Sequence, residues 1–239
     1  MLITSCRTNK GTIKYYIFSC EEGITEAIKD ANSGKYELIS YGLISVIKTD
    51  GFKEFYREYL VENYGIILSL GGCVVLEGSK CYREKIKELI YEEYGNDIFE
   101  VAKLGAIDEF RKTKEFIRDI KPEMDSGKVY WSWILHKQPR FIIENKEIDF
   151  IEYLGFADFE VDHYNKKNYC EISFIIEKNG VISDVKFKNA ETREPIINDA
   201  LMIKINGVHK WESGIYLGEV VRSSVSFDVP IRLIETYPR

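Results

Sequence analysis

Proline is scarce in this chain, which has 5 prolines among 239 residues. So few prolines argue against a long stiff linker or a disordered arm, because such segments are usually rich in proline. The sequence also lacks an excess of positive charge, since its net charge is −6 and its isoelectric point is about 5.4. An acidic chain has no general attraction for nucleic acid or anionic lipid, so we expect no nucleic-acid partner.

Long apolar runs are lacking as well. The longest run without a charge, residues 65–76, has about half of the roughly 20 residues that a membrane-spanning helix needs. It contains Gly71-Gly72 and therefore predicts a β-hairpin or bulge instead. With 45% apolar and 30% charged residues, the composition is typical of a soluble globular protein with a sizeable core.

Motifs for catalysis or metal binding are also missing. The sequence contains no phosphate loop and no H-E-x-x-H, G-x-S-x-G or C-x-x-C motif. In the run Glu160-Val161-Asp162-His163, an extended backbone puts both carboxylates on the face opposite the imidazole. We therefore predict no catalytic residue, no metal ion and no cofactor, and we expect that the protein is not an enzyme.

Three of the 5 cysteines are candidates for modification. Ile3-Thr4-Ser5-Cys6 has the residue classes of a bacterial lipobox, in which Cys6 would carry the lipid. Only Met1-Leu2 precede the motif, so either the true start lies further upstream or the match is due to chance. Cys73 and Cys81 flank the predicted hairpin and can form a disulfide in an oxidising compartment, with two buried thiols as the alternative.

Residues 1–124 are predicted to form a helix-rich α+β domain, whose role the sequence does not indicate. Apolar residues recur at helical spacing in 23–32, after Asp50 as far as Gly65, in 82–94 and in 97–120. Residues 36–47 predict a strand. The cluster of Pro, Asp, Ser and Gly in residues 122–127 marks the domain boundary.

Residues 125–239 are predicted to form a second α+β domain. Residues 128–135 predict a strand, with Trp131 and Trp133 on one face as core or interdomain packing, or alternatively as an aromatic ligand platform. A short helix is predicted within 146–154.

Regular alternation begins at Tyr169. It predicts a hairpin about Asn179-Gly180, a helix from about Thr192 to Gly207, and a last strand from about Val220 to Ile234. Because Pro230 cannot donate a hydrogen bond, this strand is expected to have a free edge.

Residues 137–234 resemble the C-terminal domain of the TonB family. The resemblance is carried by Gln138-Pro139-Arg140-Phe141, by the hairpin of residues 172–185, and by Trp211-Glu212-Ser213-Gly214, Gly218-Glu219-Val220-Val221 and Val229-Pro230-Ile231. Ser213 replaces the proline that is usual in the family's Trp-x-Pro-Gly turn. The sequence contains neither the membrane helix nor the proline-rich spacer of an energy transducer, so the resemblance implies only the binding half of the family's function.

In that family an extended segment of an outer-membrane transporter pairs with the exposed last strand, a mode called β-augmentation. The resemblance therefore implies a protein partner and a location in the periplasm or cell envelope. Partner-binding residues would then lie along the last strand: Arg222, Ser224, Ser226, Phe227, Asp228, Val229 and Pro230. The alternative is an ordinary strand covered by the chain itself or by a second subunit in a homodimer, because Asp228 and Pro230 also protect strand edges.

Two other functions stay open. One is a periplasmic or cytosolic enzyme with an unrecognised active site in the amino-terminal domain. The other is a cytosolic interaction module that reuses the fold.

Overall fold

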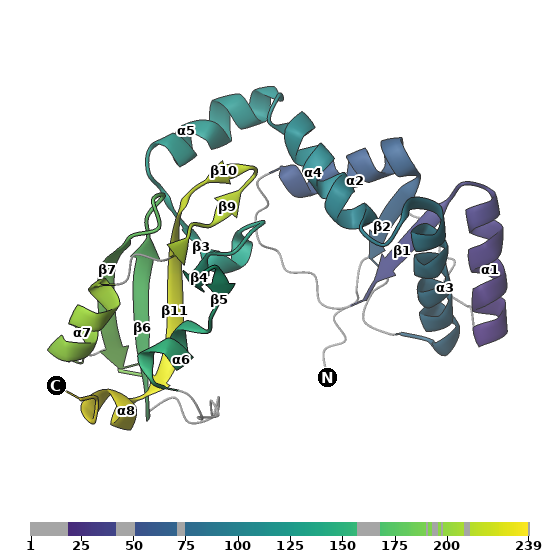
Figure 1. Ribbon diagram of the computed structural model, residues 1–239. Coiled ribbons are helices and arrows are strands. Elements are labelled where there is room, and N and C mark those ends of the chain that lie inside the picture. The colour runs from purple at the N-terminus through teal and green to yellow at the C-terminus, as the bar shows by residue number, and fades with distance from the viewer. Residues whose placement is uncertain are drawn as a thin grey trace, which may run out of the picture. The chain divides into compact units, whose positions relative to one another are not determined.

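The computed structural model describes residues 19–41, 51–70, 75–156, 168–189, 191–192, 196, 198–207 and 211–238. Helices and strands are mixed in it, which confirms the predicted α+β class. The chain falls into two compact units, unit 1 up to Phe116 and unit 2 from Ile117 (Figure 1). Residues 122–127, marked as a boundary by the sequence, lie instead in a helix and its end within unit 2.

Unit 1 combines helices with a pair of parallel strands. Its elements are α1 (Cys20–Asn32), β1 (Tyr36–Ser40), α2 (Phe52–Tyr64), β2 (Ile66–Leu70), α3 (Glu77–Tyr94) and α4 (Ile98–Phe110). The strands pair in parallel from Tyr36↔Ile66 to Ser40↔Leu70, and α2 supplies the crossover that parallel strands need. The hairpin or bulge predicted at Gly71-Gly72 lies outside the described residues; β2 itself pairs with the earlier β1, and residues 75–76 lead directly into α3.

Some helix ends in unit 1 match the sequence prediction and others do not: α3 begins at Glu77, five residues before the predicted start. α2 ends at Gly65, as predicted, with φ of 65°. Its N-cap is Gly51, whereas the predicted cap Asp50 lies outside the described residues. The single helix predicted over 97–120 is interrupted, because α4 ends at Phe110 and the Thr113 hydroxyl accepts a hydrogen bond from Phe116 N–H at 3.2 Å.

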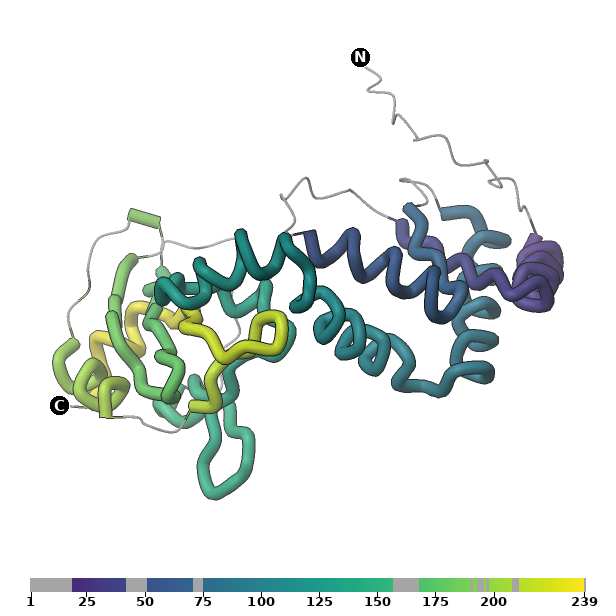
Figure 2. The backbone as a smooth tube through the Cα atoms, turned by 90° about the horizontal axis from the view of Figure 1, so that it is seen from above, coloured from purple at the N-terminus to yellow at the C-terminus, as the bar shows by residue number. Residues whose placement is uncertain are grey.

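α1 and α3 lie side by side (Figures 1 and 2). A Cβ atom on Gly23 would come 2.2 Å from the carbonyl oxygen of Gly78, so the close approach of the two helices requires glycine there. Between the same two helices, the Tyr82 hydroxyl donates a 2.8 Å hydrogen bond to the buried carboxylate of Asp30. Burial and this carboxylate raise the pKa of Tyr82, which keeps the hydroxyl protonated as the donor.

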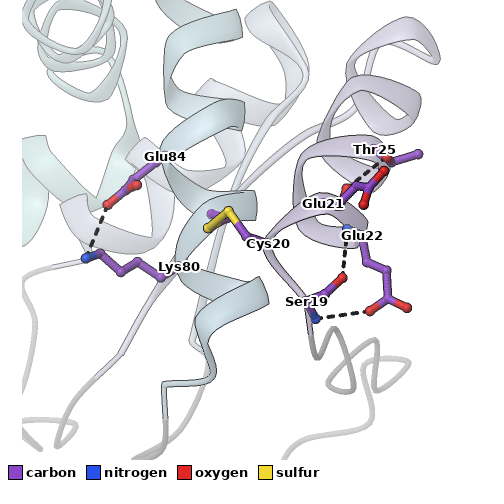
Figure 3. Close-up of a disulfide and its surroundings, with 8 residues drawn as sticks. Ser19, Cys20, Glu21, Glu22, Thr25, Lys80 and Glu84 are labelled. Atoms are coloured by element: carbon purple, nitrogen blue, oxygen red, sulfur yellow. Dashed lines mark hydrogen bonds and ion pairs between the residues drawn. A yellow bond between two sulfur atoms is a disulfide. The ribbon is translucent and has the colours of Figure 1, made fainter.

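A disulfide joins α1 to α3 at the same contact (Figure 3). It links Cys20 to Cys81, whose Cα atoms are 5.2 Å apart. The predicted Cys73–Cys81 pair is therefore wrong, because α1 brings Cys20 to the first turns of α3; Cys73 itself lies outside the described residues. Next to Cys20, Ser19 and Glu22 form a reciprocal capping box that fixes the start of α1.

Unit 2 is built on an antiparallel sheet with one parallel strand added. After the π-helix η1 (Phe116–Ile120), its elements are α5 (Lys121–Asp125), β3 (Val129–Trp131), the 3₁₀ helix η2 (Ser132–Ile134), β4 (Arg140–Ile143), β5 (Lys146–Glu147), α6 (Phe150–Leu154), β6 (Tyr169–Ile176), β7 (Ile182–Asn189), α7 (Asp199–Asn206), β8 (Trp211–Glu212), β9 (Ile215–Tyr216), β10 (Glu219–Val220), β11 (Arg222–Pro230) and α8 (Ile231–Glu235). The main sheet has the order β3-β11-β6-β7. The predicted sequence of hairpin, helix and long strand is thus present as β6–β7, α7 and β11.

The β6–β7 hairpin contains two irregular positions. In its turn the Gly180 N–H donates to the Glu177 carbonyl at 2.9 Å, and a Cβ atom on Gly180 would come 2.2 Å from the carbonyl oxygen of Trp211. In β7, Asp184 has φ of 52° beside a register shift. This bulge changes the alternation, so Ile182 rather than the predicted Val181 is buried in the core.

The core of unit 2 lies on one face of the sheet. Cys170, Ile172, Phe174 and Ile176 of β6 are buried as predicted, and Leu201 and Ile205 of α7 pack in the same cluster. An aromatic group completes it: Phe141, Phe150 and Trp211, with ring centroids 5.1–5.4 Å apart.

The last strand is shorter than predicted. β11 ends at Pro230, and Ile231–Glu235 form the helix α8. The helical turn places Ile234 in the core, and the Asn198 side-chain amide donates to the Ile234 carbonyl at 2.6 Å. Burial of Ile234 explains why the chain leaves the sheet here.

Candidate functional site

The two sides of β11 are covered to different extents. β6 pairs with β11 in an antiparallel orientation from Ser223 to Pro230. β3 pairs with it in parallel only from Arg222 to Ser224. Arg222 and Ser224 therefore lie inside the sheet, which corrects the prediction of a free edge along the whole strand. Beyond them no strand in the described part of the chain pairs with the second side of residues 225–230, which we call the open edge.

The start of the open edge is set by the path of β3. Its last residue is Trp131, and the 3₁₀ helix η2 then turns the chain away, closed by a hydrogen bond from Leu135 N–H to the Ser132 carbonyl at 3.2 Å. Trp131 and Trp133 are 60% and 61% exposed, so the prediction that they belong to the core is wrong. The 3₁₀ turn breaks the two-residue period on which that prediction depended.

The position of Pro230 indicates which backbone groups face the open edge. Pro230 lies opposite Tyr169 within the β6 pairing and has no N–H. A proline is tolerated in a ladder where the N–H would point away from the partner strand. Because this direction alternates along a strand, we expect the N–H and C=O groups of Ser226 and Asp228 to face the open edge, and those of Val225 and Phe227 to face β6.

On the core side, the open edge leaves apolar side chains incompletely covered. Val225 and Phe227 are half-buried, whereas Ser223 and Val229 on the same face have no exposed surface. The Phe227 ring lies 5.9 Å from Phe150 and 6.1 Å from Phe174, measured between centroids. Apolar surface is thus available next to the backbone groups of the open edge.

The other face of the sheet carries a shallow hollow of about 450 Å³. Its lining includes Trp131 of β3 and Ser224 and Ser226 of β11. The residues that line it are Val129, Trp131, Glu171, Ser173, Phe174, Ile175, Asp184, Lys186, Lys188, Ser224, Val225 and Ser226. The side chains of Lys186 and Asp184 form an ion pair there at 2.5 Å.

Arg222 has a different role from the one predicted. Its guanidinium binds the Glu177 carboxylate at 2.7 Å and donates to the Gly127 carbonyl at 2.8 Å. Arg222 and the Ser183 hydroxyl hold the pKa of Glu177 below its usual range. Arg222 therefore anchors the start of β11.

The other predicted binding residues differ in access. Val229 and Pro230 are buried, Phe227 is half-buried, and Ser226 and Asp228 are exposed. The structure thus leaves three of the predicted residues accessible at the open edge: Ser226, Phe227 and Asp228. Val225 is an addition that the sequence prediction missed, and Trp131, weighed there as part of an aromatic ligand platform, lies at the start of the open edge.

Among the described residues, His136 and Cys170 take structural roles. Cys6 and His163 lie outside the described residues. The His136 ring accepts a hydrogen bond from Leu217 N–H at 2.8 Å and stacks on Tyr216. Burial raises the pKa of the Cys170 thiol to about 11, so it is a poor nucleophile.

Within the described ranges, no group of three or more His, Cys, Asp and Glu residues is placed to hold a metal ion. The helices of these ranges also include none with the length and apolar character needed to cross a bilayer.

No protein-family model, curated protein or solved structure matches this chain. Membership of the TonB family therefore stays a prediction from the sequence motifs.

Proposed function

We propose that unit 2 is a non-enzymatic binding module that takes up an extended protein segment as an added strand along the open edge. The observation that carries this proposal is the early end of β3, which leaves residues 225–230 paired on one side among the described strands. Each backbone hydrogen bond to an incoming strand contributes about 0.5–1.5 kcal/mol. Burial of the exposed parts of Val225 and Phe227 adds to this.

The cell envelope is the location that fits best. The Cys20–Cys81 disulfide favours an oxidising compartment, such as the periplasm. The TonB-like motifs favour a segment of an outer-membrane transporter as the partner, and Cys6 remains the candidate for attachment by a lipid. A cytosolic interaction module would be expected to keep its cysteines reduced.

Proline substitutions test strand addition directly. In Ser226→Pro the donor toward the open edge is lost, so Kd for an added strand should rise roughly thirtyfold, about 2 kcal/mol, with the fold retained. Val225→Pro removes a donor toward β6 and should instead destabilise unit 2. Binding is measured by fluorescence anisotropy with a labelled peptide of alternating valine and serine, and folding by tryptophan fluorescence.

Ser226→Ala is the matched control, because it keeps the backbone donor and should bind like the parent protein. The proposal is refuted if both proline variants fold normally and bind the peptide as tightly as the parent. Sedimentation of the parent and of Ser226→Pro tests the homodimer. If the parent self-associates and Ser226→Pro does not, the segment bound at the open edge is a second copy of this chain.

A further inference from the structure

The outer face of the sheet has an unbalanced row of charges at the open edge. In the strand register, Asp228 lies directly opposite Glu171, and Glu171 lies opposite Lys188 on β7. Like charges that face each other across two strands are unfavourable. Asp228 thus has a carboxylate on its inner side and the open edge on its outer side, and no described cation forms an ion pair with it.

The line of β3 and the exposed Trp131 ring determine which side chains an added strand would contact. Such a strand continues the line of β3, so its first outward side chain lies beside Ser226 and the next beside Asp228. Same-face side chains on a strand are about 6–7 Å apart, so the exposed Trp131 ring is within reach of the first position. Side chains that point the other way lie beside Val225 and Phe227.

We infer that the open edge selects extended segments in which lysine or arginine alternates with apolar residues. The cation lies beside Asp228, where it relieves the repulsion from Glu171, and a second cation beside Ser226 stacks on Trp131. The apolar residues cover Val225 and Phe227. This inference rests on the proposed strand addition and adds the chemical class of the partner.

Three labelled peptides of about ten residues test the selection. Each alternates valine with one other residue, which is lysine, glutamate or serine. With the full chain, Kd for the lysine peptide should be at least about fivefold lower than Kd for the serine peptide. The glutamate peptide should bind more weakly than either. Raising the salt concentration to about 0.5 M should reduce these differences, since the charges are exposed.

A charge reversal separates a local effect from a general one, because the whole chain has a net charge of −6 and attracts any cationic peptide. Asp228→Lys should reverse the order, so that the glutamate peptide binds best. Asp199→Lys makes the same change in net charge on the exposed start of α7 and should leave the lysine preference in place.

A lysine preference that survives Asp228→Lys overturns the inference. Equal binding of the three peptides, lost in Ser226→Pro, also overturns it but leaves strand addition standing. If none of the peptides binds the full chain, both strand addition and the selection of basic residues are refuted.

Discussion

The two units are stabilised in different ways. In the described part of unit 1 the sheet is a single parallel pair of short strands, and a disulfide links two helices that pack together. In unit 2 the main sheet has four described strands with long antiparallel registers, and one continuous core of aliphatic and aromatic residues packs on it. A two-stranded sheet is marginally stable by itself, so unit 1 depends on packing of its helices and on a covalent link, whereas unit 2 depends on its core.

Removal of a core ring should produce the largest difference between the units. We expect Phe174→Ala to lower the free energy of unfolding of unit 2 by about 3–5 kcal/mol, because Phe174 is 2% exposed and packs on Phe150 and Trp211. All 3 tryptophans, at 131, 133 and 211, lie in unit 2, so tryptophan fluorescence during urea unfolding reports on that unit. Phe174→Leu should lower the free energy of unfolding much less than Phe174→Ala. Equal decreases for the two variants would show that the site is loosely packed.

Removal of the disulfide should act on the other unit and somewhat less strongly. The bond closes a loop with a sequence separation of 61, so Cys20→Ser combined with Cys81→Ser should destabilise unit 1 by about 2–4 kcal/mol. The loss should appear in helical circular dichroism, while the tryptophan transition of unit 2 stays where it was. A reducing agent should reproduce the loss in the parent and leave the double variant unchanged. A tryptophan transition that shifts as much as the helical one would show that the units do not unfold independently.

The ion pair that anchors β11 should have the smallest effect. Because the folded state lowers the pKa of Glu177, the pair stabilises unit 2 above the ordinary glutamate pKa, and this contribution is lost as the pH falls through the lowered value. Glu177→Gln should therefore lower the free energy of unfolding by about 1 kcal/mol at pH 7 and have little effect at a pH below the lowered pKa of Glu177. Urea unfolding of the parent and of Glu177→Gln at the two pH values measures this change in the free energy of unfolding. A difference between the two proteins that does not depend on pH would show that the stability is lost through packing.

Unit 2 was the easier unit to predict because its pattern is local. Alternation from Cys170 to Ile176 and the Asn179-Gly180 turn specify a hairpin within a few residues of each other, and the structure contains it. The bulge at Asp184 was not predictable, because the positive φ there depends on the register with β6. The end of β11 was missed for a similar reason: Ile231 and Leu233 continue the alternation, but burial of Ile234 decides in favour of a helix.

Unit 1 shows what apolar patterns leave undetermined. The helix that ends at Gly65 and the strand that begins at Tyr36 were both predicted, and both are present. The direction of pairing between β1 and β2 is a property of chain topology, so residues 66–70 fitted a hairpin equally well. Likewise, Cys20 and Cys81 are far apart in sequence, and only the packing of α1 on α3 makes them partners.

The candidate site was predictable in its strand but not in its extent. The alternation of Ser226, Phe227 and Asp228 placed these residues on a strand near an edge, and they remain accessible there. The sequence did not show that β3 would pair with Arg222–Ser224 and then turn away, because the alternation through residues 128–135 gives no sign of the 3₁₀ turn that begins at Ser132. The pairing partner of a short strand is decided by the tertiary fold.

The link between Cys20 and Cys81 also closes residues 20–81 of unit 1 into a covalent ring. The ring contains α1, β1, α2, β2 and the first turn of α3. A backbone cut anywhere between the two cysteines therefore leaves one molecule, whose pieces separate only after reduction. Strands β1 and β2 both lie on this ring, so each remains at a high effective concentration for the other even when their hydrogen bonds are broken.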